Sequence, residues 1–288
     1  MPANWLRVTA RSPSDELSGL LAEGLLACGG TAIEDRGDAL VTYIPLDDDA
    51  AEILARVREE LHAILGVEPA HLDGEQVPEQ DWLALWRSGL QPRRIGGRLI
   101  VSPTWSEVRA APDDIVIRID PQMAFGTGEH ASTRGVLTLM QNVIVPGARL
   151  LDVGSGSAIL AIAGVLLGAD HAVAAESDED AQANAAENVT RNGVAGQVTL
   201  LCARVDETFL HQYGGGAFDG ILANVLSGVL VPLLPAFHRS LADAGWAILS
   251  GILPEEADTV RLAAEQAGFS VEAEHTEEQW WSVTLRCH

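Results

Sequence analysis

The first feature of this sequence that predicts chemistry is a turn of small residues followed by an acid. The segment LDVGSGSAIL passes from an apolar strand into a glycine turn and then into a helix. Gly154 and Gly156 allow such a turn and let a ligand approach the backbone closely. Glu176 ends the next predicted strand, where an acid about 20 residues after the turn can bind both ribose hydroxyls of an adenosine. These residues predict a nucleoside-containing cofactor.

The residues around the turn favour one class of cofactor. A nicotinamide dinucleotide site needs a third glycine three residues after the second, and Ile159 occupies that position. Asp152 begins the turn, and its carboxylate, with backbone carbonyls, can hold the amino group of a methionine-type cofactor. We therefore expect S-adenosylmethionine to bind at Asp152, Gly154, Gly156 and Glu176. A nicotinamide dehydrogenase is the less favoured alternative.

Asn224 ends a later predicted strand of the same series, within ILANVL. In a nucleotide-binding fold, the loop at this position faces the reactive end of the cofactor. A side-chain amide there offers a carbonyl acceptor to an incoming amine. The structural alternative is a turn-forming asparagine at a strand end. We expect Asn224 to be the catalytic residue and also a cofactor contact.

A second glycine-containing segment, DPQMAFGTGEHAST, precedes the first predicted helix of the nucleotide domain. Two glycines on either side of Thr127 suit a loop folded over a ligand, so we expect Phe125 and Thr127 to contact the cofactor. Ser132 and Thr133 can present hydroxyls at the start of the helix. His130 is a candidate general base, although a lone histidine is more often a hydrogen-bonded structural residue.

Alternating strands and helices explain how these residues come together. From residue 131 onward the chain predicts strands at 149–152, 172–175, 198–202, 218–223 and 246–250 with helices between them, then an antiparallel hairpin at 269–273 and 281–285. This alternation predicts a Rossmann-like α/β domain, a parallel sheet with helices on both faces. Ligands of such sheets bind at the C-terminal ends of the strands, where the candidate residues lie.

The N-terminal part predicts a separate α+β module. Its pattern is strand, helix, strand, strand, helix, strand, which is typical of a small ferredoxin-like sandwich. A connector follows, with a short helix carrying Trp82 and Trp86, a turn at Gly96–Gly97, and two strands. The tryptophans serve either domain packing or substrate binding. The expected strands are 5–9, 31–35, 39–44, 71–77, 98–102 and 115–119, the expected helices about 12–28 and 47–65, and the expected divisions 1–77, 78–125 and 126–288.

Composition narrows the function classes. The chain has 288 residues and a formal net charge of -23, which disfavours direct binding to nucleic acid. No apolar run has the length of a membrane helix and the N-terminus lacks a signal-peptide core, so we expect a cytoplasmic protein without a membrane partner. Three cysteines lie far apart, which argues against a disulfide framework or a metal site.

The chain resembles the family of methyltransferases that modify ribosomal protein eleven of the large subunit, often called PrmA. The matching stretches occur in family order: EQDWLALWRSGLQPRRIGGRLIVSPTW, DPQMAFGTGEHAST, LDVGSGSAILAIA, AENVTRNGV, ILANVL and LSGIL. The resemblance implies a seven-stranded class I methyltransferase domain behind a substrate-recognition domain at 1–77. It also implies methylation of lysine side chains and an N-terminal amine, and cofactor contacts at Thr133, Gly154, Glu176 and Asn224.

Several positions depart from the family pattern, among them Ala131 in place of a proline, Asp178-Glu179 in place of Asp-Pro, and two that bear on the cofactor. Glu176 stands where most members carry aspartate, and Ala158 stands where glycine is common. The first change keeps the charge and adds a methylene, so the ribose contact must adjust. The second adds a methyl group that either crowds the cofactor or replaces a glycine of helix packing. The alternatives are a methyltransferase of the same fold for another protein, and a degenerate module that binds cofactor or protein without turnover.

Overall fold

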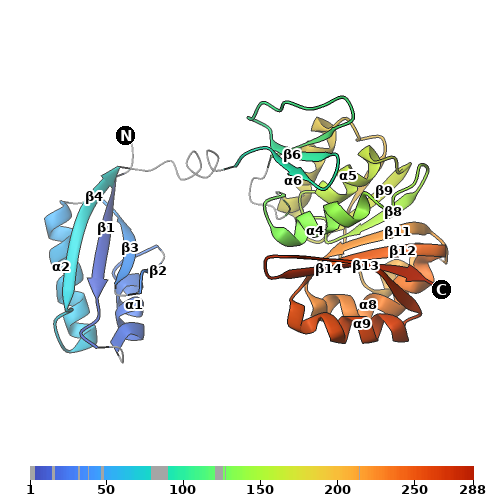
Figure 1. Ribbon diagram of the computed structural model, residues 1–288. Coiled ribbons are helices and arrows are strands. Elements are labelled where there is room, and N and C mark those ends of the chain that lie inside the picture. The colour runs from blue at the N-terminus through green and yellow to red at the C-terminus, as the bar shows by residue number, and fades with distance from the viewer. Residues whose placement is uncertain are drawn as a thin grey trace. The chain divides into compact units, whose positions relative to one another are not determined.

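The computed structural model describes residues 4–14, 17–31, 33–37, 39–46, 49–78, 90–120, 126, 128–213 and 215–288. The chain divides into two compact units, Met1–Gly89 and Leu90–His288 (Figure 1). The first unit has a single apolar core, and the second has two apolar clusters. Within the described ranges, we find no helix with the length and apolar character needed to cross a membrane.

The first unit is the predicted ferredoxin-like sandwich. Its neighbouring strands pair antiparallel in the order β2-β3-β1-β4. Leu6 and Val8 of β1 point to the core that both helices cover. The elements are β1 (Asn4–Arg11), α1 (Ser18–Ala27), β2 (Glu34–Asp35), β3 (Leu40–Pro45), α2 (Ala50–Leu65) and β4 (His71–Pro78).

Helix α2 shows how the local sequence produces this unit. An apolar side chain at every fourth position faces the core, as the helical period requires. The Asp49 carboxylate accepts a hydrogen bond from the Ala51 amide at 2.9 Å, which caps the N-terminus. Gly66 ends the helix with a φ of 71°, a conformation that glycine adopts without steric cost. The buried residues are Ile53, Val57, Leu61 and Leu65.

Two sequence-based boundaries in this unit were wrong. Helix α1 begins at Ser18, not near Ser12, because the Leu17 amide first forms a tight turn with the Ser14 carbonyl at 3.1 Å. Strand β2 spans Glu34–Asp35, because these are the two described residues of this stretch that pair in register with β3. The first difference is a local turn in place of a first helical turn, whereas the second depends on strand pairing, which a local sequence pattern does not contain.

The second unit is built on the seven-stranded sheet that the fold class predicted. Its strand order is β10-β9-β8-β11-β12-β14-β13. Strands β8 to β12 pair parallel, and β14 runs antiparallel to both of its neighbours. The strands are β8 (Arg149–Val153), β9 (His171–Glu176), β10 (Val198–Cys202), β11 (Phe218–Asn224), β12 (Leu241–Ile252), β13 (Phe269–Glu277) and β14 (Trp280–Cys287).

Helices cover both faces of this sheet. Helices α4 to α6 lie on one side and α8 and α9 on the other, and α7 packs against α8 (Figure 1). Alternate strand residues divide between the two layers: Leu150 belongs to the first apolar cluster and Leu151 to the second. The helices are α4 (Ala131–Met140), α5 (Ile159–Leu166), α6 (Glu179–Arg191), α7 (Glu207–Tyr213), α8 (Ser227–Ser240), the short η2 (Pro254–Glu256) and α9 (Ala257–Gln266).

A small three-stranded sheet precedes the nucleotide fold in this second unit. It contains β5 (Arg93–Ile95), β6 (Leu99–Pro103) and β7 (Ile115–Ile119). The expectation that Gly96–Gly97 joins a helix to a strand was wrong, because this turn joins the antiparallel strands β5 and β6. The Gln141 side chain accepts hydrogen bonds from the Gly97 and Arg98 amides at 3.2 and 3.1 Å. The predicted helix with Trp82 and Trp86 lies outside the described residues.

Candidate active site

Three adjacent strands bring the candidate residues to the same level of the sheet. Val153 of β8 pairs with Ala223 of β11 on one side and with Ala175 of β9 on the other. The residues that follow these three positions, namely Asn224, Gly154 and Glu176, therefore lie next to one another at this edge of the sheet. The chain winds outward in opposite directions from β8 and β11, so this edge is the topological switch point where α/β sheets bind ligands.

The glycine turn after β8 has the backbone conformation that only small residues tolerate. Gly154 and Gly156 have φ values of 65° and 50°. A side chain at position 154 would meet the Val225 side chain at 2.7 Å. The amides of Gly154 and Ser155 donate to the Ala175 carbonyl at 2.9 and 3.1 Å, which attaches the turn to β9. The turn is therefore narrow and fixed.

Ala158 ends this turn in the left-handed region, with a φ of 62°, and forms the N-cap of α5. A left-handed conformation costs a residue with a Cβ atom about 1–2 kcal/mol. Its methyl group is fully buried in the cluster between the sheet and helices α4 to α6. The alanine therefore adopts a conformation that favours glycine, and its methyl packs into the core.

Glu176 folds across the glycine turn. Its Oε2 accepts a hydrogen bond from the Gly156 amide at 3.0 Å. Its Oε1 accepts from the amides of Ser177 and Asp178 at 2.7 and 3.0 Å. The glutamate side chain thus reaches the turn that it faces. Since a carboxylate oxygen accepts two hydrogen bonds, Oε2 keeps capacity for one more donor.

Asp152 is fully buried in β8 and directed toward α5. Its Oδ2 accepts a hydrogen bond from the Ala161 amide at 3.0 Å. Its Oδ1 has no hydrogen-bond partner in the described part of the chain. Burial raises the pKa of Asp152 to about 7; the Ala161 hydrogen bond opposes this shift, and the charge of Glu176 adds to it. A buried acceptor without a partner suits a cationic ligand.

Asn224 contacts the start of α4. Its Nδ2 donates to the Thr133 hydroxyl at 3.2 Å. Its Oδ1 is buried and has no hydrogen-bond partner among the residues that the structure describes. The Thr133 contact fixes which way the amide points, so the unpartnered carbonyl oxygen is the group left to meet a donor.

His130 lies near the start of α4. His130 and Asn224 both belong to the described residues, and they form no hydrogen bond with each other. Its Nδ1 is 2.6 Å from the Ser132 hydroxyl, and its ring packs against Trp280 with centroids 4.9 Å apart. Burial lowers the pKa of His130, as does the positive charge of Arg134. The Ser132 and Thr133 hydroxyls do not cap α4. They bond instead to His130 and Asn224.

The GTGEH segment needs both of its glycines. Gly126 and Gly128 have φ values of 97° and 82°. A Cβ at either position would lie 2.7 Å from another side chain, Ser157 for Gly126 and Val101 for Gly128. The predicted contacts Phe125 and Thr127 lie outside the described residues.

The sequence reasoning missed Arg134. This buried side chain donates to the carboxylates of Glu277 and Glu278 at 2.8 and 2.7 Å, and to the Glu129 carbonyl. It therefore joins the turn between β13 and β14 to the start of α4. An arginine in the first turn of an apolar helix was the only local signal, because its partners are 143 and 144 residues away.

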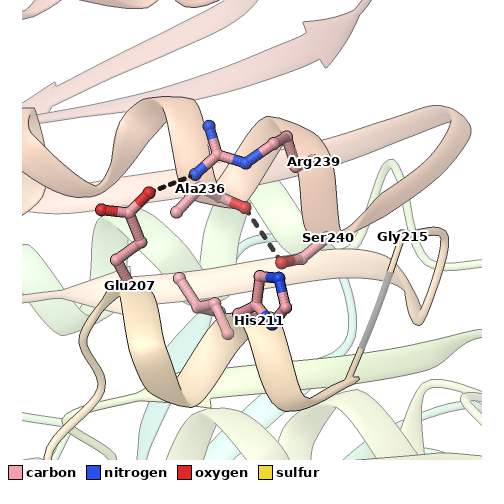
Figure 2. Close-up of a pocket in the computed structure, with 7 residues that line it drawn as sticks. Glu207, His211, Gly215, Ala236, Arg239 and Ser240 are labelled. Carbon is pink, nitrogen blue, oxygen red and sulfur yellow. Dashed lines mark hydrogen bonds and ion pairs between the residues drawn. The ribbon is translucent and has the colours of Figure 1, made fainter.

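One cavity lies away from these residues. It has a volume of about 420 Å³ and is formed by α7 and the end of α8 (Figure 2). Glu207 and Arg239 form an ion pair of 2.6 Å across it, and Ser240 donates to the Ala236 carbonyl at 2.9 Å (Figure 2). Because Ser240 directly precedes β12, this cavity is at the opposite end of the strands from Asn224. It does not belong to the candidate active site.

Comparisons with known proteins agree with the predicted resemblance. The family model described as ribosomal protein L11 methyltransferase (PrmA) matches residues 24–288. Ribosomal protein L11 methyltransferases of Pelotomaculum thermopropionicum and Geobacter metallireducens are 34% and 35% identical; the alignments cover 98% and 99% of this chain and 98% of each relative. A solved ribosomal protein L11 methylase from Lactobacillus delbrueckii subsp. bulgaricus is 27% identical with a TM-score of 0.60, over 69% of this chain and 98% of that one. The chain belongs to the ribosomal protein L11 methyltransferase family.

Proposed function

We propose that this protein transfers methyl groups from S-adenosylmethionine to lysine side chains and the N-terminal amine of ribosomal protein L11. Family membership makes the chain a methyltransferase with S-adenosylmethionine as the donor, as the sequence predicted. The observation that carries the amine assignment is the buried, unpartnered Oδ1 of Asn224 next to the glycine turn. An acceptor at this position suits the N–H groups of an incoming amine.

The residues present fit this cofactor. Asp152 Oδ1 is a buried acceptor without a partner, which an amino group would satisfy. Gly154 and Gly156 leave the backbone open to close approach. Glu176 Oε2 retains capacity for a ribose hydroxyl beside its bond to Gly156. We assign these four residues to cofactor binding, with Thr133 and Asn224 at the reactive end and Phe125 and Thr127 as predicted contacts.

When bound, S-adenosylmethionine supplies a methyl group activated by a sulfonium. The protein's own task is to present a neutral amine in the correct orientation. A lysine amine has an unperturbed pKa of about 10.4 and must lose a proton before attack. Asn224 Oδ1 accepts an N–H of the amine, and Thr133 keeps the amide from rotating. Since positioning supplies most of the rate, no side chain has to act as a strong base, and the proton leaves to water.

The N-terminal unit is assigned to recognition of the target protein. The support is its separate apolar core and its compactness as a unit. We keep residues 1–77 as the recognition domain, 78–125 as the connector and 126–288 as the methyltransferase domain. With L11 as substrate, the enzyme is expected to act in the cytoplasm. The net charge of -23 favours a basic protein as partner over nucleic acid.

Mass spectrometry of purified L11 after incubation with the enzyme and S-adenosylmethionine tests the proposal. We expect mass increases of whole methyl groups on lysines and on the N-terminal amine, and far less methylation with Asn224→Ala at the same early time point. Calorimetry with S-adenosylmethionine separates the alternatives. Binding without transfer to L11 would indicate another substrate or a degenerate module, and absence of binding would refute the proposal.

A further inference from the structure

Helix α6 and its C-cap carry three asparagines at four-residue spacing, Asn184, Asn188 and Asn192, which we call the asparagine row. Asn188 and Asn192 belong to the stretch AENVTRNGV, to which the sequence assigned no role. Asn184 and Asn188 are 2% and 0% exposed. Burying an amide is costly unless its hydrogen bonds are made, so the partners of this row are structurally important.

The asparagine row extends the hydrogen bonding of β7. Asn192 accepts from the Arg118 amide at 2.8 Å and donates to the Arg118 carbonyl at 2.7 Å, as a neighbouring strand would. Asn188 accepts from the Asp120 amide at 2.9 Å, and Asn184 donates to the Asp120 carbonyl at 3.0 Å. The backbone after β7 is therefore fixed by side chains of α6.

Asn188, unlike Asn192, reaches the glycine turn. Its Nδ2 donates to the Ser157 carbonyl at 3.3 Å, and it also lies 3.2 Å from Asn184 Oδ1. Ser157 lies between Gly156 and Ala158 in the glycine turn. The Ser157 hydroxyl in turn donates to the Gly126 carbonyl at 2.6 Å. Two backbone positions, at 120 and 126, are thus joined to the same turn residue, one of them through Asn188.

We propose that Asn188 is a positioning residue for cofactor binding, which holds the glycine turn through the Ser157 carbonyl and fixes it relative to Asp120. Asn188 has no exposed surface, so it acts through the backbone and not by contact with a ligand. Gly156, whose amide binds Glu176, directly precedes Ser157. Loss of the Asn188 bond therefore displaces the same turn that orients Glu176. This inference rests on the proposed cofactor function.

The test compares Asn188→Ala with Asn192→Ala in the full chain. Both variants remove an amide that binds the backbone of β7 or of the residue after it, but only Asn188 reaches the glycine turn. Binding of S-adenosylhomocysteine is measured by calorimetry, and Tm by thermal unfolding. We expect both variants to lower Tm, and only Asn188→Ala to weaken binding, by about tenfold or more. Equal Kd values in the two variants would overturn the proposal.

A second measurement does not depend on the ligand. Hydrogen exchange of the amides at 154–160 should accelerate in Asn188→Ala and stay unchanged in Asn192→Ala. If Asn188→Ala does not fold, Asn188→Asp replaces it, because a carboxylate keeps the acceptor for the Asp120 amide and removes the donor to Ser157. Unchanged exchange in the Asn188 variant would refute the positioning role. Wild-type protein that fails to bind S-adenosylhomocysteine would refute the proposed function instead.

Discussion

The proposed active site has a cofactor half and an acceptor half, which are built differently. In the cofactor half, Gly154, Gly156 and Glu176 belong to one β–α–β segment, and main-chain amides satisfy the Glu176 carboxylate. In the acceptor half, Asn224 and Thr133 are 91 residues apart and meet through a single side-chain hydrogen bond. The cofactor half is thus shaped mainly by its own backbone, whereas the acceptor half depends on one oriented amide, whose Oδ1 has no partner among the described residues.

This difference implies a separation of roles. A site shaped by the backbone resists small perturbations, and its side chains mainly affect how tightly the cofactor binds. Substitutions in a site that depends on one oriented amide change mainly the rate of transfer. A displacement of the reacting group by about 1 Å can lower the rate by about 100-fold. Substitutions in the two halves should therefore change different kinetic constants.

The largest effect is expected in the acceptor half. Asn224→Ala removes the oriented acceptor and should lower kcat for L11 methylation by about 100-fold. The Kd for S-adenosylhomocysteine should change much less, because Asn224 is one of several proposed cofactor contacts. Thr133→Val, which removes the partner of the Asn224 amide, should have a smaller effect on kcat. Steady-state kinetics and calorimetry measure both quantities, and a wild-type rate in Asn224→Ala would contradict the orienting role.

Glu176→Ala should show the opposite pattern. Loss of its charge-assisted bonds should weaken cofactor binding by about 1–3 kcal/mol, which is roughly 5- to 150-fold in Kd. At saturating cofactor, kcat should change little. Glu176→Gln is the matched control, since it keeps the length and removes the charge. If the Ala variant binds as tightly as wild type in calorimetry, the ribose assignment is wrong.

A smaller, pH-dependent effect is expected at Asp152. Burial raises the pKa of this carboxyl from 3.8 to about 7, so the folded protein holds a proton that the unfolded chain releases above pH 4. Its contribution to stability therefore falls as the pH rises from about 4 to 7. The cationic amino group of the cofactor favours the carboxylate, so binding releases a proton near or below pH 7.

The affinity for S-adenosylmethionine should therefore rise from pH 6 to pH 8. Calorimetry in buffers of different ionisation enthalpy counts the protons released. Asp152→Asn should remove this pH dependence. A wild-type affinity that is constant over this range would exclude Asp152 as the group that meets the amino group.

The smallest effect concerns backbone strain in the cofactor half. Ala158→Gly relieves the left-handed conformation and should raise the free energy of unfolding by about 0.5–1 kcal/mol. Ala244, with a φ of 57° at an exposed position of β12, provides the control. Ala244→Gly should give a similar gain in denaturant unfolding and leave cofactor affinity unchanged. A loss of stability in Ala158→Gly would mean that the buried methyl outweighs the strain.

Much of the cofactor half could be predicted from the sequence alone. The apolar strands, the small residues at 154 and 156 and the acid at 176 follow one another within a short stretch. They indicate a cofactor site because of the strand period, the turn geometry and the rule that ligands bind at the C-terminal ends of parallel strands. Asn224 could be predicted for the same reason, because it ends a strand of this series.

Other features were decided only by the tertiary structure. The sequence does not show that Arg134 binds Glu277 and Glu278. Nor does it show the contact of Asn188 with Ser157 or that of Thr133 with Asn224. Local periodicity specifies which face of an element is apolar, but it does not specify which distant polar group will satisfy a buried donor or acceptor. That choice is made when the elements pack, because each buried polar atom must then find its partner among the groups that packing brings near.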